Sequence, residues 1–280
     1  MMKSLTFILL LFLISACRPK PIDIDIPQAE EKLVVSSIMI PPSIFGIVLT
    51  KSFSALESND LGTQSDPNVD LFNQLVVPNS TVTIEYDNEI KTLTELTGGI
   101  YVGIDIEQTV GKNYTLRATD PSTGKSISST TTIPPFVELK SALLVKKLIF
   151  EDEGLDVTIS VDDPPGKNYY LAGVYGQLIE STKDLQSISL VNSAYYVFSD
   201  EGRDGQSISE KFLIDRWEGD TAVVSFSNIS EDYYLYLASR QRSQNAIPFI
   251  SEPVSLKSNI ENGYGFFGLH IPDIEFFQLQ

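Results

Sequence analysis

The feature that most constrains this chain is an alternation of apolar and polar residues with a period of two, which recurs from Lys32 onward. In residues 81–86, Val82, Ile84 and Tyr86 alternate with two threonines and a glutamate. Successive side chains of a strand point to opposite faces of a sheet, so this pattern predicts a strand buried on one face. Short runs of this kind, closed by polar turn residues, predict an all-β chain.

The prolines at 134 and 135 divide this series of predicted strands. Proline cannot donate a hydrogen bond within a central strand, so a strand ends at such a pair and a linker can begin. We therefore predict two tandem β-sandwich domains of the immunoglobulin or fibronectin type, at residues 30–135 and 136–280. The segment 56–77, rich in Ser, Asn and Asp, is expected to be a long surface loop of the first domain.

One segment of the second domain departs from period two. Residues 230–242 begin with Ser230, a favourable helix cap, continue with two acids and end with arginines, which is typical of an α-helix near the C-terminus. Tyr233 and Leu237 lie on the stripe that we expect to pack on a sheet. In residues 259–268 glycines alternate with aromatics, which predicts a kinked strand or a close approach of two backbones.

The N-terminus carries the features of an exported lipoprotein. Lys3 precedes an apolar run at 5–14, too short for a bilayer core that needs roughly 20 residues, and small residues then precede Cys17. This pattern predicts a lipoprotein signal peptide at residues 1–16, cleaved before a cysteine that becomes acylated. Cys17 is the only cysteine in the sequence, so a disulfide cannot explain it. Residues 17–29 contain three prolines and are expected to form a lipidated tether to a membrane.

The charge of the chain restricts its partners. With 37 acidic and 20 basic residues, the formal net charge is −17. Binding to phosphates depends on Lys and Arg, so we exclude nucleic acid as a partner and expect membrane contact through the lipid anchor alone. The hydrophobic fraction of 42% is that of a chain that buries a core, which excludes an acidic disordered segment.

Common catalytic groups are scarce. His270 is the only histidine and has no motif partner, so we interpret it as structural or exposed, and Cys17 is consumed by acylation. We therefore assign no catalytic residue and no cofactor. A carboxylate-based hydrolase acting on glycans needs neither histidine nor cysteine, and it stays open as an alternative.

A cluster of acids in one turn is the only metal candidate that the sequence presents. Asp200, Glu201 and Asp204 offer oxygen ligands of the kind that calcium prefers. Their spacing lacks the EF-hand pattern, and Arg203 within the cluster is expected to neutralise it. We interpret the run as a solvated turn, with calcium binding as the alternative.

Tyrosines are concentrated in the second half of the chain, which holds nine of the twelve. A tyrosine side chain offers rigid, amphipathic contact area that suits sugars and peptides. Two doublets on predicted strands are therefore candidate binding residues for a glycan or peptide. They are Tyr169, Tyr170, Tyr195 and Tyr196.

Several segments, taken in order, resemble one family of bacterial proteins. The segments are residues 22–27 (IDIDIP), 111–114 (GKNY), 132–135 (TIPP), 163–166 (DPPG), 229–234 (ISEDYY) and 258–268. Together with the lipoprotein signal they resemble a Bacteroidota outer-membrane lipoprotein family catalogued as domain of unknown function 4249. The resemblance covers nearly the whole mature chain.

The resemblance implies a location and a role, but no established activity. It implies an outer-membrane lipoprotein of a kind often encoded beside TonB-dependent receptors, hence a non-enzymatic accessory or binding protein linked to such a receptor system. Surface-exposed lipoproteins of this phylum carry an acidic signal after the cysteine, and residues 18–21 (RPKP) depart from it. Both the periplasmic and the surface face of the outer membrane therefore stay open.

Overall fold

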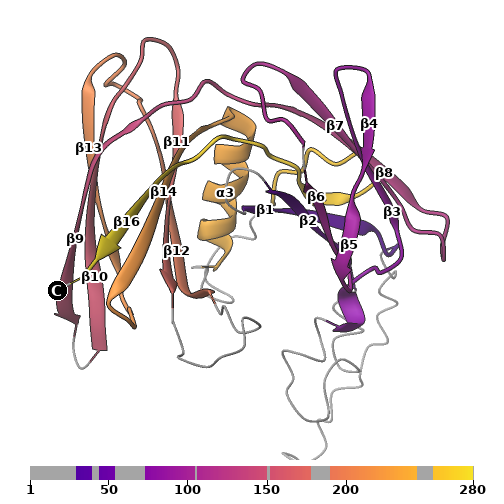
Figure 1. The fold of residues 1–280 in the computed structure, drawn as a ribbon, viewed down its shortest axis with the longest axis horizontal. Coiled ribbons are helices and arrows are strands. Elements are labelled where there is room, and N and C mark those ends of the chain that lie inside the picture. Colours follow the sequence, from indigo (N-terminus) through magenta and orange to yellow (C-terminus); the bar gives the residue numbers. More distant parts are fainter. Residues whose placement is uncertain are drawn as a thin grey trace, which may run out of the picture. The chain divides into compact units, whose positions relative to one another are not determined.

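The chain folds into two pairs of β-sheets, as the computed structural model in Figure 1 shows. The structure describes residues 30–39, 44–53, 73–104, 106–149, 152–177, 190–244 and 255–279. Almost all regular structure in these ranges is β-strand. The predicted all-β class, with sheets packed as in a sandwich, is confirmed.

The first pair consists of sheet A, in the order β15-β1-β2-β6-β5, and sheet B, in the order β4-β3-β7-β8. Their strands are β1 (Leu33–Met39), β2 (Ile44–Lys51), β3 (Thr81–Tyr86), β4 (Glu89–Thr92), β5 (Thr94–Thr97), β6 (Ile100–Ile104), β7 (Asn113–Thr119), β8 (Ser126–Thr132) and β15 (Tyr264–Phe266). Alternate residues of each strand face one shared core, in which Val35, Ile47, Ile84 and Leu116 are fully buried. Strand β8 ends just before the Pro134 and Pro135 pair, where the sequence predicted a stop.

The segment that returns from β3 is divided between two sheets. Asp87 and Asn88 both adopt positive φ angles, of 50° and 62°, which form the tight hairpin turn that matches strand twist. At Leu93 the chain divides into β4, which pairs with β3, and β5, which pairs with β6. Leu93 is buried in the core at the point where the chain passes from sheet B to sheet A.

The second pair consists of sheet C, in the order β13-β10-β9, and sheet D, in the order β12-β11-β14-β16. Their strands are β9 (Leu139–Ile149), β10 (Asp152–Asp162), β11 (Tyr169–Gln177), β12 (Leu190–Ser199), β13 (Ser207–Ile214), β14 (Thr221–Ile229) and β16 (Asp273–Gln278). The core between the two sheets contains Val157, Tyr170 and Phe226, all fully buried. Strand β16 was not predicted from the sequence.

Helix α3 (Glu231–Gln244) covers part of the outer face of sheet D, as the orange helix in Figure 1 shows. The Oγ of Ser230 accepts a hydrogen bond from the backbone N–H of Tyr233, which caps the helix as predicted. Tyr233 and Leu237 are buried in a third hydrophobic cluster with Leu171 and Val197 of the sheet. The predicted helix and its packing stripe are therefore confirmed.

The C-terminal segment returns to the first pair of sheets before it enters sheet D. Strand β15 pairs in parallel with β1, and Phe267 packs edge-on against Phe45 in the first core. The close backbone approach expected in this segment is present, because a Cβ on Gly265 would lie 1.9 Å from the carbonyl oxygen of Val35. Residues 136–280 were predicted to form the second sandwich, but β15 pairs with β1, and Ile260, Phe267 and Leu269 are buried in the core of the first.

The N-terminal predictions fall outside the described residues. This applies to the signal peptide at 1–16, to Cys17 and to the tether at 17–29. Most of the surface loop predicted at 56–77 also lies outside the described residues. Among the helices that the structure describes, none combines the length and the apolar character required to cross a membrane.

Candidate functional site

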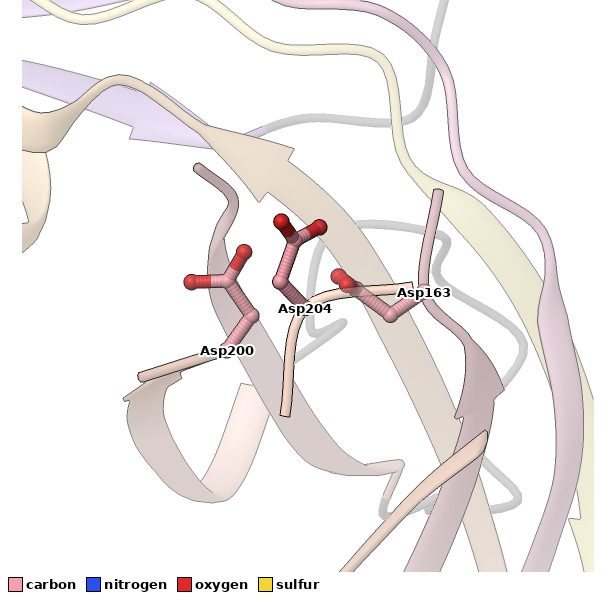
Figure 2. A group of neighbouring side chains, drawn as sticks. All are labelled: Asp163, Asp200 and Asp204. Carbon is pink, nitrogen blue, oxygen red and sulfur yellow. The ribbon is translucent and has the colours of Figure 1, made fainter. Parts of the chain in front are cut away.

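Two turns of the second pair of sheets bring three aspartates together. Asp163 directly follows β10, Asp200 directly follows β12, and Asp204 lies in the turn that leads into β13. One carboxylate oxygen from each lies within 4.8 Å of the others, and Figure 2 shows the three side chains side by side. Asp163 and Asp200 are buried, whereas Asp204 is exposed. We name these three residues the acidic junction.

Backbone N–H groups from the opposite turn satisfy each carboxylate of the acidic junction. Asp163 accepts from Gly205, and Asp204 accepts from Gly166, each at 2.8 Å. Asp200 accepts from Asn168 at 2.8 Å. Because each turn provides both acceptors and donors for the other, the acidic junction clamps residues 163–168 against residues 200–206.

The clamp extends into the core through Tyr170. The Tyr170 hydroxyl donates a hydrogen bond to Oδ1 of Asp163, and its ring stacks on Phe226. Burial, followed by the hydrogen bond to Asp163, raises the pKa of Tyr170 above its ordinary value. The hydroxyl therefore remains protonated and serves as a donor at every physiological pH.

A second buried chain of hydrogen bonds connects the clamp to the linker between the sandwiches. The Nδ2 of Asn168 donates to the carbonyl oxygens of Pro164 and Gly166 within its own turn. The Nδ2 of Asn228 donates to Oδ1 of Asn168 at 3.3 Å and to the carbonyl oxygen of Pro135 at 3.2 Å. These contacts attach the turn to the proline pair at which the first series of strands ends.

The membership of the cluster differs from the sequence prediction. Glu201 is not part of it, and Asp163, 37 positions before Asp200, takes its place. Arg203 does not neutralise the junction, because its guanidinium pairs with Glu210 at 2.6 Å and donates to the carbonyl oxygen of Ser199. Asp163 was missed because its segment, DPPG, was interpreted only as a turn between strands.

The geometry of the acidic junction favours a structural role over a catalytic or metal-binding one. Three carboxylates at this spacing have the oxygen chemistry that hard cations such as calcium prefer. The hydrogen bonds from Gly166, Asn168 and Gly205 account for the same arrangement as a clamp between turns. Glycan hydrolysis needs two carboxylates that flank a bound sugar, whereas these three are directed at backbone within the fold. We interpret the acidic junction as structural.

The structure does not bring the four candidate binding tyrosines to one surface. Adjacent strand residues point to opposite faces, so each doublet is divided between the core and the outer face of sheet D. Tyr170 is fully buried in the core, and Tyr196 stacks on Phe212 on the same inner side. Tyr169 and Tyr195 lie on the outer face, where they pack against the cluster beneath α3.

Several polar atoms of the described residues are buried without hydrogen-bond partners. Among the described residues, these atoms include the Tyr195 hydroxyl, the Oγ atoms of Ser225 and Ser227, and Nδ1 of His270. The ring of His270 lies 6.0 Å from that of Tyr233, and burial lowers the pKa of His270 to about 4. Burial, with a hydrogen bond to Glu231, raises the pKa of Tyr169 to about 12.

A comparison with models of protein families identifies the family of this chain. The sequence matches the family described as "Domain of unknown function (DUF4249)" over residues 19–271. The chain belongs to the DUF4249 family. The assignment to this domain of unknown function, which the motifs predicted, is therefore confirmed. The DUF4249 match includes α3, the acidic junction and every strand of both pairs of sheets except β16, which follows it.

Comparisons with individual proteins add little to the family assignment. No curated protein matches the sequence. One similar solved structure is the crystal structure of dimeric latent PorU from Porphyromonas gingivalis, at 13% identity and a TM-score of 0.21. The match covers 71% of this chain and 19% of the PorU chain, so this DUF4249 chain spans only a small part of that protein.

Proposed function

We propose that this chain is an outer-membrane lipoprotein that acts as a non-enzymatic accessory or binding protein of a TonB-dependent receptor system. The observation that carries the proposal is the position of Cys17. It is the only cysteine in the sequence, and it stands directly after Ile14, Ser15 and Ala16, at the end of a short apolar run. Acyl chains on this residue hold the protein on the membrane, since each buried CH₂ contributes roughly 0.8 kcal/mol.

The number of residues between the anchor and the first strand fits a tethered protein. Strand β1 begins at Leu33, so 33 − 17 − 1 = 15 residues lie between the anchor and the first strand. A fully extended chain of this length reaches at most about 55 Å. The prolines at 19, 21 and 27 favour extended backbone, which suits a tether between an anchor and a folded body.

Substitution of the anchor tests the lipoprotein part of the proposal. Cys17→Ser is expected to remove the protein from carbonate-washed membranes and to abolish incorporation of a palmitate analogue. Lys20→Ser, which changes the tether and keeps the cysteine, serves as the matched control and should remain in the membrane. Retention of Cys17→Ser in washed membranes would contradict the proposal.

Purification of the tagged protein from detergent-solubilised outer membranes tests the accessory role. We expect a TonB-dependent receptor to accompany the protein with Cys17 intact. The receptor should be depleted from the Cys17→Ser preparation, because that variant leaves the membrane. Purification of the intact protein without any outer-membrane protein would overturn the accessory role while leaving the lipid anchor in place.

A further inference from the structure

The outer face of sheet C exposes aliphatic side chains that a solvent-facing sheet would replace with polar ones. Leu143 and Val145 of β9 are 61% and 50% exposed, and Leu213 of β13 is 45% exposed. Strand register places Val145, Asp156 and Leu213 in one row across the three strands. Leu143 lies two residues from Val145 on the same face, so the three aliphatic side chains form one patch.

The outer face of sheet B provides an internal comparison, because it has the composition expected of a face that contacts water. The exposed positions of β7 and β8 hold hydroxyl residues, with Thr115 bonded to Thr130 and Thr119 bonded to Ser126 across the strands, each at 2.9 Å. On β4 of the same face, Ile90 is a single exposed aliphatic side chain rather than part of a row. The outer face of sheet D is covered in part by α3. The aliphatic patch on sheet C is therefore a local departure, of the kind that marks an interaction site.

The charges around the patch differ in sign from the chain as a whole. Asp156 lies between Lys211, at 3.1 Å, and Lys147, at 3.7 Å, and its side chain is only 20% exposed. Two lysines and one aspartate give this part of the face a net charge of 2 − 1 = +1, in a chain with a net charge of −17. The hydrogen bond from Lys211, together with the charge of Lys147, lowers the pKa of Asp156, so the group stays ionised.

We propose that this face, which we name the sheet C face (Leu143, Val145, Lys147, Lys211 and Leu213), docks a partner protein whose surface is apolar with acidic groups around it. The inference rests on the accessory role proposed above and identifies the surface that performs it. Aliphatic side chains provide the buried centre of the interface, and the two lysines orient an acidic partner. Asp156 holds both lysines beside the patch.

Charge argues against two other occupants. A second copy of the chain carries the same net charge of −17, so the two copies repel each other. An anionic lipid surface is negative throughout and is repelled by the net charge of the chain, whereas a partner protein needs acidic groups only opposite the two lysines. A protein with an apolar, acidic surface satisfies both the aliphatic patch and the lysines.

Site-specific photocrosslinking in intact cells tests the sheet C face. A photoreactive phenylalanine analogue is placed at Val145 or Leu213, and at Thr130 or Arg117 of sheet B as matched controls. We expect adducts with the receptor at the two sheet C positions, about tenfold more abundant than at the controls. Equal adducts at all four positions, or adducts with a second copy, would overturn the inference.

The outcomes separate this inference from the proposed function. If the receptor co-purifies but no adduct forms at Val145 or Leu213, the docking surface is wrong and the accessory role stands. If the receptor does not co-purify, the accessory role fails, and the docking inference fails with it.

Charge reversal tests the second part of the inference. Lys147→Glu with Lys211→Glu is expected to reduce receptor recovery about tenfold in low salt. Lys147→Gln with Lys211→Gln removes charge without reversing it and should give an intermediate recovery. Both variants must retain the wild-type unfolding midpoint, which the exposed positions of the two lysines favour. Unchanged recovery with both folded variants would contradict an acidic partner surface.

Discussion

Asn168 and Asp200 hold each other by two hydrogen bonds. The backbone N–H of Asn168 donates to Oδ2 of Asp200 at 2.8 Å, and the backbone N–H of Asp200 donates to the carbonyl oxygen of Asn168 at 3.2 Å. Both residues are buried, so water cannot replace either contact. The pair therefore fixes two turns that the sequence places far apart.

Asp200→Ala is expected to destabilise the protein by about 2 kcal/mol, because it leaves the N–H of Asn168 buried without an acceptor. Urea unfolding followed by intrinsic fluorescence measures the free energy of unfolding. Glu201→Ala serves as the control, since Glu201 is exposed and lies outside the acidic junction, and it should change this free energy by less than about 0.5 kcal/mol. Equal effects of the two substitutions would contradict the clamp.

Tyr170→Phe is expected to cost about 1.5–3 kcal/mol, because the buried carboxylate of Asp163 loses its hydroxyl donor while the ring contacts remain. Tyr196→Phe is the matched control. Its hydroxyl donates to Glu210 over a longer distance of 3.3 Å in a partly exposed position, so the loss should be under about 1 kcal/mol. Thermal and urea unfolding of both variants check the order of the two effects.

Period-two alternation predicted the β-strands well because it reflects a local property, the orientation of successive side chains. Strand β13 (Ser207–Ile214) and the capped helix α3 follow from such local signals. The pairing of β15 with β1 did not follow, because these segments lie more than 220 residues apart and a strand of three residues carries little periodicity. Only the glycines around residue 265 indicated a close approach there.

The candidate site was predictable only in part, for the same reason. Asp200 and Asp204 are near each other in sequence, and composition sufficed to group them. Asp163 joins them only because strand order places the end of β10 beside the turn after β12. The two tyrosine doublets do not form one binding surface. Adjacent strand residues such as Tyr169 and Tyr170 face opposite sides of the sheet.

His270 is expected to make the protein less stable in acid. Burial lowers its pKa from 6.5 to about 4, so the unfolded chain binds a proton at a pH where the folded protein does not. Stability that is present above pH 6.5 is therefore lost progressively as the pH falls from 6.5 toward 4. The loss amounts to about 3 kcal/mol for this one group.

The contribution of His270 is measured as a difference between two proteins. Urea unfolding of the wild type and of His270→Phe is compared between pH 7.5 and pH 4.5. The many carboxylates titrate in both proteins and cancel, so the difference in unfolding free energy should change by about 2 to 3 kcal/mol across this range. Parallel curves for the two proteins would show that the imidazole is not buried in its neutral form.

Gly265 permits the parallel pairing of β15 with β1, and its replacement separates two physical effects. Gly265 has a φ angle of 94°, and a Cβ there would lie 1.9 Å from the carbonyl oxygen of Val35. Gly202 has a similar φ of 75°, but a Cβ there would meet no atom within 4 Å. Gly202→Ala should therefore cost only the strain of a positive φ, about 1 kcal/mol.

Gly265→Ala should cost about 3 kcal/mol or more, because the same strain is combined with a backbone clash that breaks the β1–β15 pairing. Hydrogen exchange then locates the loss. Faster exchange is expected at Val35 and Phe266, whereas the core of sheet C, including Val157, should keep its protection in the folded protein. Equal costs for the two alanine variants would show that the strands separate to accept a side chain, and the close approach would then have no energetic role.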